Sequence, residues 1–135
     1  MLEINPPQQT ERENYKLLIG SVVPRPIAFV TSEGEDGTLN GTPFSYFNVI
    51  TADPAMLSLS VQRKKWYSER YNKEYISKGK LCHSHIVSKP YLEQMNKTAA
   101  SLRPDESELT LAELTTIPSK QISTPGVKEA KVRYE

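Results

Sequence analysis

Three short apolar stretches separated by turn-forming residues lie between residues 26 and 61, and they limit the fold more than any other feature. The first, PIAFVTS (residues 26–32), is rich in apolar and β-branched residues, as a strand is. It is followed by SEGEDGTLNG, whose Asp36-Gly37 pair and other glycines predict the turn of a hairpin. The last, AMLSLSV (residues 55–61), alternates apolar residues with serines, which is typical of a half-buried strand. The sequence therefore predicts a strand-rich chain.

Helices are expected only at the margins of these strands. Residues 1–13 are interpreted as an exposed arm, and residues 14–18 as a short helical turn that stops before Gly20. Ser88 can cap a helix in which apolar side chains recur at helical spacing. Those apolar residues are Leu92, Met95 and Ala99. Two further elements are predicted, a short helix at residues 108–114 and an edge strand at residues 127–134.

The charge balance and the termini narrow the classes of function. Lys plus Arg total 17 and Asp plus Glu total 16, so no strong field attracts nucleic acid or an acidic membrane. The single cysteine excludes an internal disulfide and fits a reducing cytoplasm. The first residues, MLEINPPQQTERE, are polar, and no apolar run approaches the roughly 20 residues that span a bilayer. We expect one cytoplasmic domain over residues 1–135.

Amide and hydroxyl side chains alternate with aromatic ones between residues 40 and 48. Such a mixture suits a flat heteroaromatic ligand, because rings can cover its faces while polar groups reach its edge. An ordinary hairpin with polar surface residues is the alternative that composition leaves open. The polar residues are Asn40, Thr42, Ser45 and Asn48, and the aromatic ones are Phe44, Tyr46 and Phe47.

The whole stretch PRPIAFVTSEGEDGTLNGTPFSYFNVITADPAMLSLSV resembles the opening of the flavin reductase-like, FMN-binding split-barrel family. That family includes flavoredoxins and the reductase components of two-component monooxygenases. Its pattern runs PRPIA-aromatic-V-S/T, then G-x-x-N-x-x-P-F-S-x-F-N, then D-P-P, and only the last proline differs here, as Ala55. A second block, HIVSKPYLEQMNKTAASLRPDESELTLAEL, is also similar, so the resemblance covers residues 14–65 and 85–135.

The resemblance implies a mainly β fold, a six-stranded Greek-key barrel with peripheral helices that is incomplete at the C-terminus of this chain. It also implies a homodimer that holds FMN near the dimer interface. Arg25 and Arg63 are candidate phosphate or cofactor contacts, although a solvated surface role fits each equally well. The residues that match the family's flavin contacts are Thr31, Asn40, Ser45, Phe47 and Asn48.

The activity implied by the resemblance is an FMN-dependent flavin reductase. Electrons would pass from NAD(P)H through FMN to free flavin, to oxygen or to a partner protein such as an oxygenase. No residue is singled out as a catalytic acid or base, and no metal ligand set is expected. Two alternatives stay open: an FMN-binding electron carrier without turnover of its own, and an inactive, truncated remnant of the family.

Residues 66–84, WYSERYNKEYISKGKLCHS, depart from the family pattern. The family is expected to carry a phosphate-binding K-D-T-x-R-N segment here, and this sequence has none. If the codons for residues 69–74 are read one base later, they allow Lys-Asp-Thr-Thr-Arg-Asn, which is that motif. This suggests the hypothesis that residues 66–84 are translated out of frame.

Three other interpretations of this segment are weighed against a shifted frame. Tyr67, Tyr71 and Tyr75 recur every fourth residue, which would place them along one stripe of an inserted helix. The C-H-x-H run at residues 82–85 has zinc-compatible ligand types but no second ligand cluster. A nucleophilic role for Cys82 lacks any marked activating group.

Overall fold

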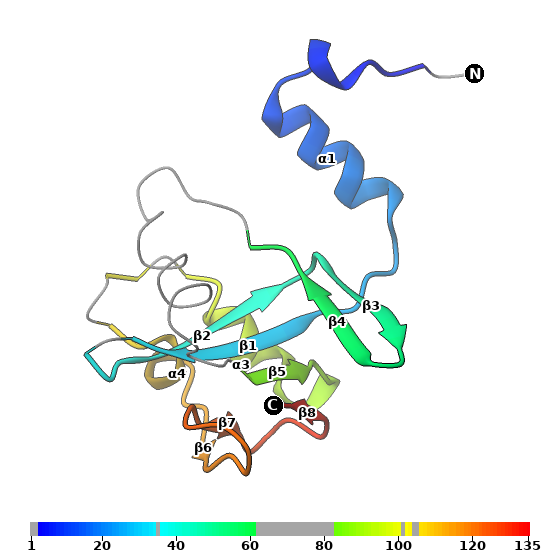
Figure 1. Cartoon of the computed structure of the whole chain (residues 1–135). Helices are drawn as coiled ribbons and strands as arrows, with labels where there is room; N and C mark the ends of the chain where they lie inside the picture. Colours follow the sequence, from blue (N-terminus) through cyan, green and yellow to red (C-terminus); the bar gives the residue numbers. More distant parts are fainter. Residues whose placement is uncertain (1–2, 35, 62–82, 101, 104–105) are drawn as a thin grey trace.

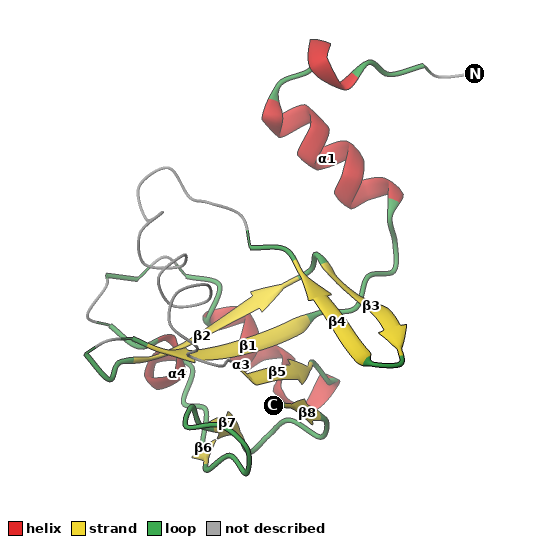
Figure 2. Ribbon diagram, viewed as in Figure 1, coloured by secondary structure: helices red, strands yellow, loops and turns green. Residues whose placement is uncertain are grey.

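In a computed structural model, the chain forms a four-stranded antiparallel sheet, a separate β-hairpin and several short helices (Figures 1 and 2). The structure describes residues 3–34, 36–61, 83–100, 102–103 and 106–135. The sheet has the strand order β2-β1-β5-β8. Its strands are β1 (Ala28–Glu33), β2 (Leu39–Phe44), β5 (His83–Ile86) and β8 (Arg133–Tyr134).

The predicted hairpin joins β1 to β2. Gly34 N donates to Thr38 O over 2.8 Å, and Gly37 N donates to Gly34 O over 3.0 Å. Gly37 has a φ of 82°, a left-handed conformation that glycine adopts without the steric cost of a Cβ. The Asp-Gly pair therefore forms the turn that the sequence indicates.

The predicted strand at residues 55–61 is confirmed as β4 (Ala55–Leu59), which pairs with β3 (Phe47–Ala52). The aromatic and polar stretch at residues 42–50 is divided between two strands, because β2 ends at Phe44 and β3 begins at Phe47. The intervening turn consists of Ser45 and Tyr46. This β2–β3 turn links the main sheet to the β3–β4 hairpin (Figure 1).

The two faces of β1 pack against two different apolar clusters. On one face Phe29 belongs to the larger cluster. On the other face Ala28 and Val30 pack with Phe47 of β3. Because successive residues of a strand point to opposite faces, β1 separates the two clusters. The larger cluster also contains Tyr91, Met95, Leu109, Ala112, Leu114, Val127 and Ala130.

Helix α1 (Glu11–Ser21) corrects the expectation of an arm at residues 1–13 followed by a short helical turn. The exposed character is confirmed, since α1 has no buried residue and stands apart from the sheet (Figure 1). The helix begins earlier because Thr10 and Glu13 form a capping box. It continues through Gly20, whose cost in a helix of about 1 kcal/mol is tolerated. A 3-10 turn, η1 (Pro6–Gln8), precedes it.

The C-terminal half is more fragmented than the sequence predicts. Ser88 makes no side-chain cap, and a 3-10 turn, η2 (Lys89–Tyr91), leads into α3 (Leu92–Lys97). The predicted helix at residues 108–114 is only α4 (Glu108–Leu111), and Glu113 then adopts a φ of 54°, which α-helical residues do not have. Instead of one strand at residues 127–134, two short strands form, β7 (Gly126–Val127) and β8. Strand β7 pairs with β6 (Thr116–Ile117), and β8 pairs with β5 at the sheet edge.

None of the helices in the described ranges is long and apolar enough to cross a membrane.

Candidate functional site

The β1–β2 hairpin separates the predicted ligand-binding residues by face. Ser32 lies opposite Asn40 in the ladder, and Thr31 lies opposite Gly41. Residues directly opposite each other in an antiparallel pair share a face, whereas neighbours along a strand do not. Ser32 and Asn40 therefore lie on one face of the sheet, and Thr31 lies on the other. We call the face of Ser32, Asn40 and Thr42 the polar face.

The polar face carries buried groups that can form hydrogen bonds. Ser32 and Asn40 are each 2% exposed, and Asn40 Nδ2 donates to Thr38 O over 3.4 Å. Thr42 Oγ1 is buried and has no hydrogen-bond partner among the described residues. A buried hydroxyl without a hydrogen-bond partner is uncommon, so a ligand or a water molecule is expected to form a hydrogen bond with it. Thr42 is one of the polar residues whose type suits a ligand site, but it is not among the residues that match the family's flavin contacts.

The β2–β3 turn presents the next polar groups along the chain. Ser60 N donates to Tyr46 O over 2.9 Å, which ties the turn to the end of β4. Asn48 is exposed, and its Oδ1 accepts from Val49 N over 2.8 Å, so its amide nitrogen is left to donate elsewhere. Ser45 is half-buried. Ser45 thus lies in a fixed turn at the end of the polar face, and Asn48 lies just after it on β3.

Two of the predicted contacts lie inside the protein instead. Thr31 is fully buried, and its hydroxyl donates to Pro125 O over 3.0 Å on the face opposite Asn40. Phe47 is 9% exposed and packs against Ala28 and Val30. The structure therefore gives both side chains a packing role.

The structure describes only one of the two predicted phosphate contacts, Arg25. Arg25 Nη1 donates to Ile19 O over 2.5 Å and to Val22 O over 2.6 Å, so its guanidinium closes the C-terminal end of α1. Arg63 and almost all of the anomalous segment at residues 66–84 lie outside the described residues, as do the tyrosine stripe and Cys82. Among the residues that the structure describes, no group of three or more His, Cys, Asp or Glu side chains could hold a metal ion.

Within the part of the chain that the structure describes, two groups have clearly shifted pKa values, and both lie away from the polar face. Burial raises the pKa of Tyr91 to about 12, with a smaller contribution from the negative charge of Glu129. The Tyr91 hydroxyl donates to Ile86 O over 3.0 Å. Hydrogen bonds from Thr10 lower the pKa of Glu13 at the start of α1. The first shift therefore reflects burial in the core and the second reflects the capping box of α1.

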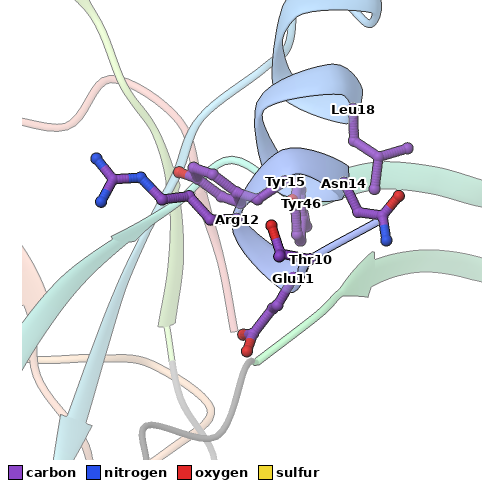
Figure 3. Close-up of a pocket in the computed structure, with 7 residues that line it drawn as sticks. All are labelled: Thr10, Glu11, Arg12, Asn14, Tyr15, Leu18 and Tyr46. Atoms are coloured by element: carbon purple, nitrogen blue, oxygen red, sulfur yellow. The ribbon is translucent and has the colours of Figure 1, made fainter. Parts of the chain in front are cut away.

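A pocket of about 550 Å³ lies between α1 and the β2–β3 turn (Figure 3). The sequence did not point to it, because the residues that line its helical side fell within or next to the presumed arm. The signal that could have found it is the T-x-x-E pattern of residues 10–13, which marks a helix start. The pocket is lined by Thr10, Glu11, Arg12, Asn14, Tyr15, Leu18 and Tyr46.

Comparison with known proteins matches residues 19–135 to a family model described as the flavin reductase like domain. The crystal structure of nitrilotriacetate monooxygenase component B from Bacillus cereus is 52% identical, with a TM-score of 0.87, over 98% of this chain and 65% of that chain. The uncharacterized protein YwrF of Bacillus subtilis is 45% identical over 128 residues, which are 95% of this chain and 62% of that protein.

The fold class predicted from the sequence is confirmed by these similarities. A split-barrel-domain structure from Shewanella frigidimarina superposes with a TM-score of 0.76 at 20% identity, over 99% of this chain and 67% of that chain. At such identity the likeness concerns the fold alone, and it agrees with the strand-rich architecture described above. The chain spans somewhat less than two thirds of the length of its B. cereus and B. subtilis relatives.

Proposed function

This chain belongs to the flavin reductase-like domain family, and we propose that it binds FMN and passes electrons from NAD(P)H to a flavin, to oxygen or to a partner protein. The observation that supports flavin binding best is the buried Thr42 hydroxyl that lacks a partner beside Asn40. Asn40 belongs to the family pattern, Thr42 lies two residues further along the same strand, and the chemistry of both fits the polar edge of a flavin ring. When bound, the flavin would supply the redox chemistry.

The residues on and around the polar face have distinct roles in this proposal. The Asn40 amide and the Thr42 hydroxyl would hold the polar edge of the flavin ring. Ser45 and the free amide nitrogen of Asn48 would contact the ribityl chain from the β2–β3 turn. Phe47 would border the site, because it packs against Ala28 and Val30 on the same face of β1. Thr31, bonded to Pro125 O on the other face, would stabilise the strand that carries Ser32.

The test is FMN binding and turnover by the wild-type chain and by Thr42→Val. Valine keeps the shape of threonine but removes the hydroxyl, so we expect FMN to bind about fivefold more weakly, as the loss of one hydrogen bond of about 1 kcal/mol predicts. Ser21→Ala in α1, whose hydroxyl donates to Leu17 O far from the polar face, is the matched control and should bind FMN normally. Binding is followed by quenching of flavin fluorescence.

The outcomes distinguish the three functions that the sequence leaves open. Steady NADH or NADPH consumption with FMN supports the reductase. FMN binding without consumption would favour an electron carrier, and no binding at micromolar FMN would favour an inactive remnant. Equal FMN affinity in wild type and Thr42→Val would remove Thr42 from the site without excluding flavin binding elsewhere.

We propose further that the active unit is a homodimer. The β3–β4 hairpin exposes Val49, Ile50 and Met56, and the end of α1 exposes Val22 and Val23. Exposed apolar side chains gathered on neighbouring elements are typical of interfaces, and two copies can cover the same surface reciprocally. Val49→Asp should therefore convert a dimer into a monomer in sedimentation velocity. Leu111→Asp on α4, also exposed but outside this surface, should leave the dimer intact.

A partner oxygenase in the cytoplasm completes the proposal. The B. cereus relative is named as one component of a monooxygenase, which makes delivery of reduced flavin to a second protein a natural role for this chain. The cytoplasmic location is supported by the single cysteine.

A further inference from the structure

We propose that the pocket between α1 and Tyr46, which we call the α1 pocket, binds the adenosine phosphate half of a dinucleotide. The inference rests on the proposed function, because a flavin reductase uses dinucleotides as substrates or cofactors. Both NADH and FAD contain this half, so the shared chemistry is an adenine base, a ribose and a phosphate.

The size and the aromatic lining of the α1 pocket fit a nucleoside. Its volume of about 550 Å³ lies within the range of roughly 300–1,000 Å³ of small-molecule sites. Tyr15 from α1 and Tyr46 from the β2–β3 turn both line it (Figure 3). Tyr15 is 45% exposed, so much of its ring is open to a ligand instead of being packed against the protein. Exposed tyrosine rings offer stacking surfaces to a base at low entropic cost.

The charged groups of the α1 pocket are those that a ribose and a phosphate need. Arg12 can pair with a phosphate, and the Glu11 carboxylate can accept hydrogen bonds from ribose hydroxyls. Within the described residues, no ion pair or hydrogen bond occupies the side chains of Glu11 or Arg12. Figure 3 shows the two side chains extending in different directions from the helix, so they can reach different parts of one ligand.

The capping box explains why these two residues, and not their neighbours, are available. The Thr10 hydroxyl and backbone N–H both bond to the Glu13 carboxylate, at 2.8 and 2.9 Å, which occupies Thr10 and Glu13 with each other. Asn14 Nδ2 donates to Pro6 O over 3.0 Å and ties η1 to the helix. These bonds fix the first turn of α1 and leave Glu11 and Arg12 to a ligand.

The position of the α1 pocket relative to the polar face supports a dinucleotide. Tyr46 lies between Ser45 and Phe47 on the turn whose flanking polar groups are proposed to hold FMN. A molecule that binds its adenosine half against Tyr46 therefore has its other half close to the flavin site. A nearby carboxylate also repels a second phosphate on the ribose, so Glu11 favours NADH over NADPH.

The primary test measures AMP binding to the full 135-residue chain by calorimetry, without flavin or turnover. We expect AMP to bind the wild-type chain and to bind about tenfold more weakly to Arg12→Ala and to Tyr15→Leu, as loss of a charged contact or of base stacking predicts. Lys16→Ala removes an equal charge from the same helix outside the pocket and should bind AMP as the wild type does. Far-ultraviolet circular dichroism checks that each variant keeps α1.

A second measurement identifies the source of the adenosine half. If it is NADH, Arg12→Ala should raise the KM for NADH about tenfold without changing kcat or the KM for reduced nicotinamide mononucleotide. If it is FAD, the same variant should weaken FAD binding and leave FMN binding unchanged. Either result supports the α1 pocket as a nucleotide site.

The outcomes separate this inference from the proposed function. Reductase activity without AMP binding, or AMP binding that Arg12→Ala and Tyr15→Leu leave intact, would overturn the α1 pocket and leave the reductase standing. AMP binding that follows the expected variant pattern without any NADH oxidation would keep the pocket and overturn the reductase.

Discussion

At the scale of single residues, the position of one side chain relative to its neighbour decides its role. Thr31 and Ser32 are adjacent in the sequence and equally suited to hold a ligand, yet they point to opposite faces of β1. The family resemblance implied a flavin contact for Thr31, whereas in the structure its hydroxyl donates to Pro125 O on the face opposite Asn40. Register depends on turn length and on packing across the sheet, which residue composition does not encode.

Gly41 shows the same dependence on packing. A Cβ at this position would lie 2.6 Å from Leu109 Cδ2 and 2.6 Å from Phe29 Cζ, because α4 approaches β2 closely there. We expect Gly41→Ala to destabilise the protein by about 1–3 kcal/mol through overpacking, measured by urea unfolding. Gly20→Ala in α1 has open space around it and should be neutral or slightly stabilising. Equal effects of the two substitutions would contradict the close approach.

Tyr91 makes the stability of the larger cluster depend on pH at the alkaline end. Burial raises its pKa in the folded protein from 10.0 to about 12, so between these values the unfolded chain loses a proton that the folded chain keeps. The stabilisation is therefore complete below pH 10.0 and decreases as the pH rises towards 12. Thermal unfolding at increasing pH should show this decrease in the wild type. In Tyr91→Phe, which also loses the bond to Ile86 O, the alkaline decrease should be smaller.

At the scale of elements, α1 is held by local bonds alone. It has no buried residue, and helices of 11 residues are marginal in water without tertiary packing. The capping box at one end and the Arg25 guanidinium at the other satisfy its terminal backbone groups. Its N-terminal signal was present in the sequence, but Gly20 and the nearby prolines suggested a much shorter element.

Acid should unravel α1 before it affects the sheet. Hydrogen bonds from the Thr10 backbone and hydroxyl lower the pKa of Glu13 below its ordinary value of 4.5. The stabilisation is present above pH 4.5 and is lost as the pH falls through the lower pKa of the folded state. Helical circular dichroism should decrease over that range in the wild type. Glu13→Gln, which keeps a capping side chain without a titrating charge, should show no such acid transition.

The strands were easier to predict than the helices because their signals are local. Alternation in residues 55–61 and the Asp-Gly turn indicated β4 and the β1–β2 hairpin, and both are present. The C-terminal elements were predicted less well, because two-residue strands such as β7 and β8 leave no periodic pattern to detect. The reading-frame hypothesis for residues 66–84 stays a prediction, which the nucleotide sequence of those codons would test.

At the scale of the whole molecule, the family resemblance carried most specifically by residues 24–61 predicted the fold class, and the match over residues 19–135 agrees with it. The candidate site was predicted less completely. Asn40, Ser45 and Asn48 lie on or beside the polar face, whereas the α1 pocket joins residues of α1 to Tyr46, which is at least 28 positions away in the sequence. Contacts between such distant segments follow from tertiary structure, and no short motif encodes them.

Strand β1 gives the molecule a further property. One face of β1 packs in the cluster around Phe29, and the other face packs in the cluster around Phe47. Displacement of β1 would therefore disrupt both clusters together. The sheet and the β3–β4 hairpin are thereby coupled into one cooperative unit, from which α1 is excluded. The part of the proposed dinucleotide site on the β2–β3 turn consequently unfolds only with the sheet. The part on α1 can unfold and refold independently of the sheet. Melting of α1 alone would therefore open the α1 pocket and leave the polar face undisturbed.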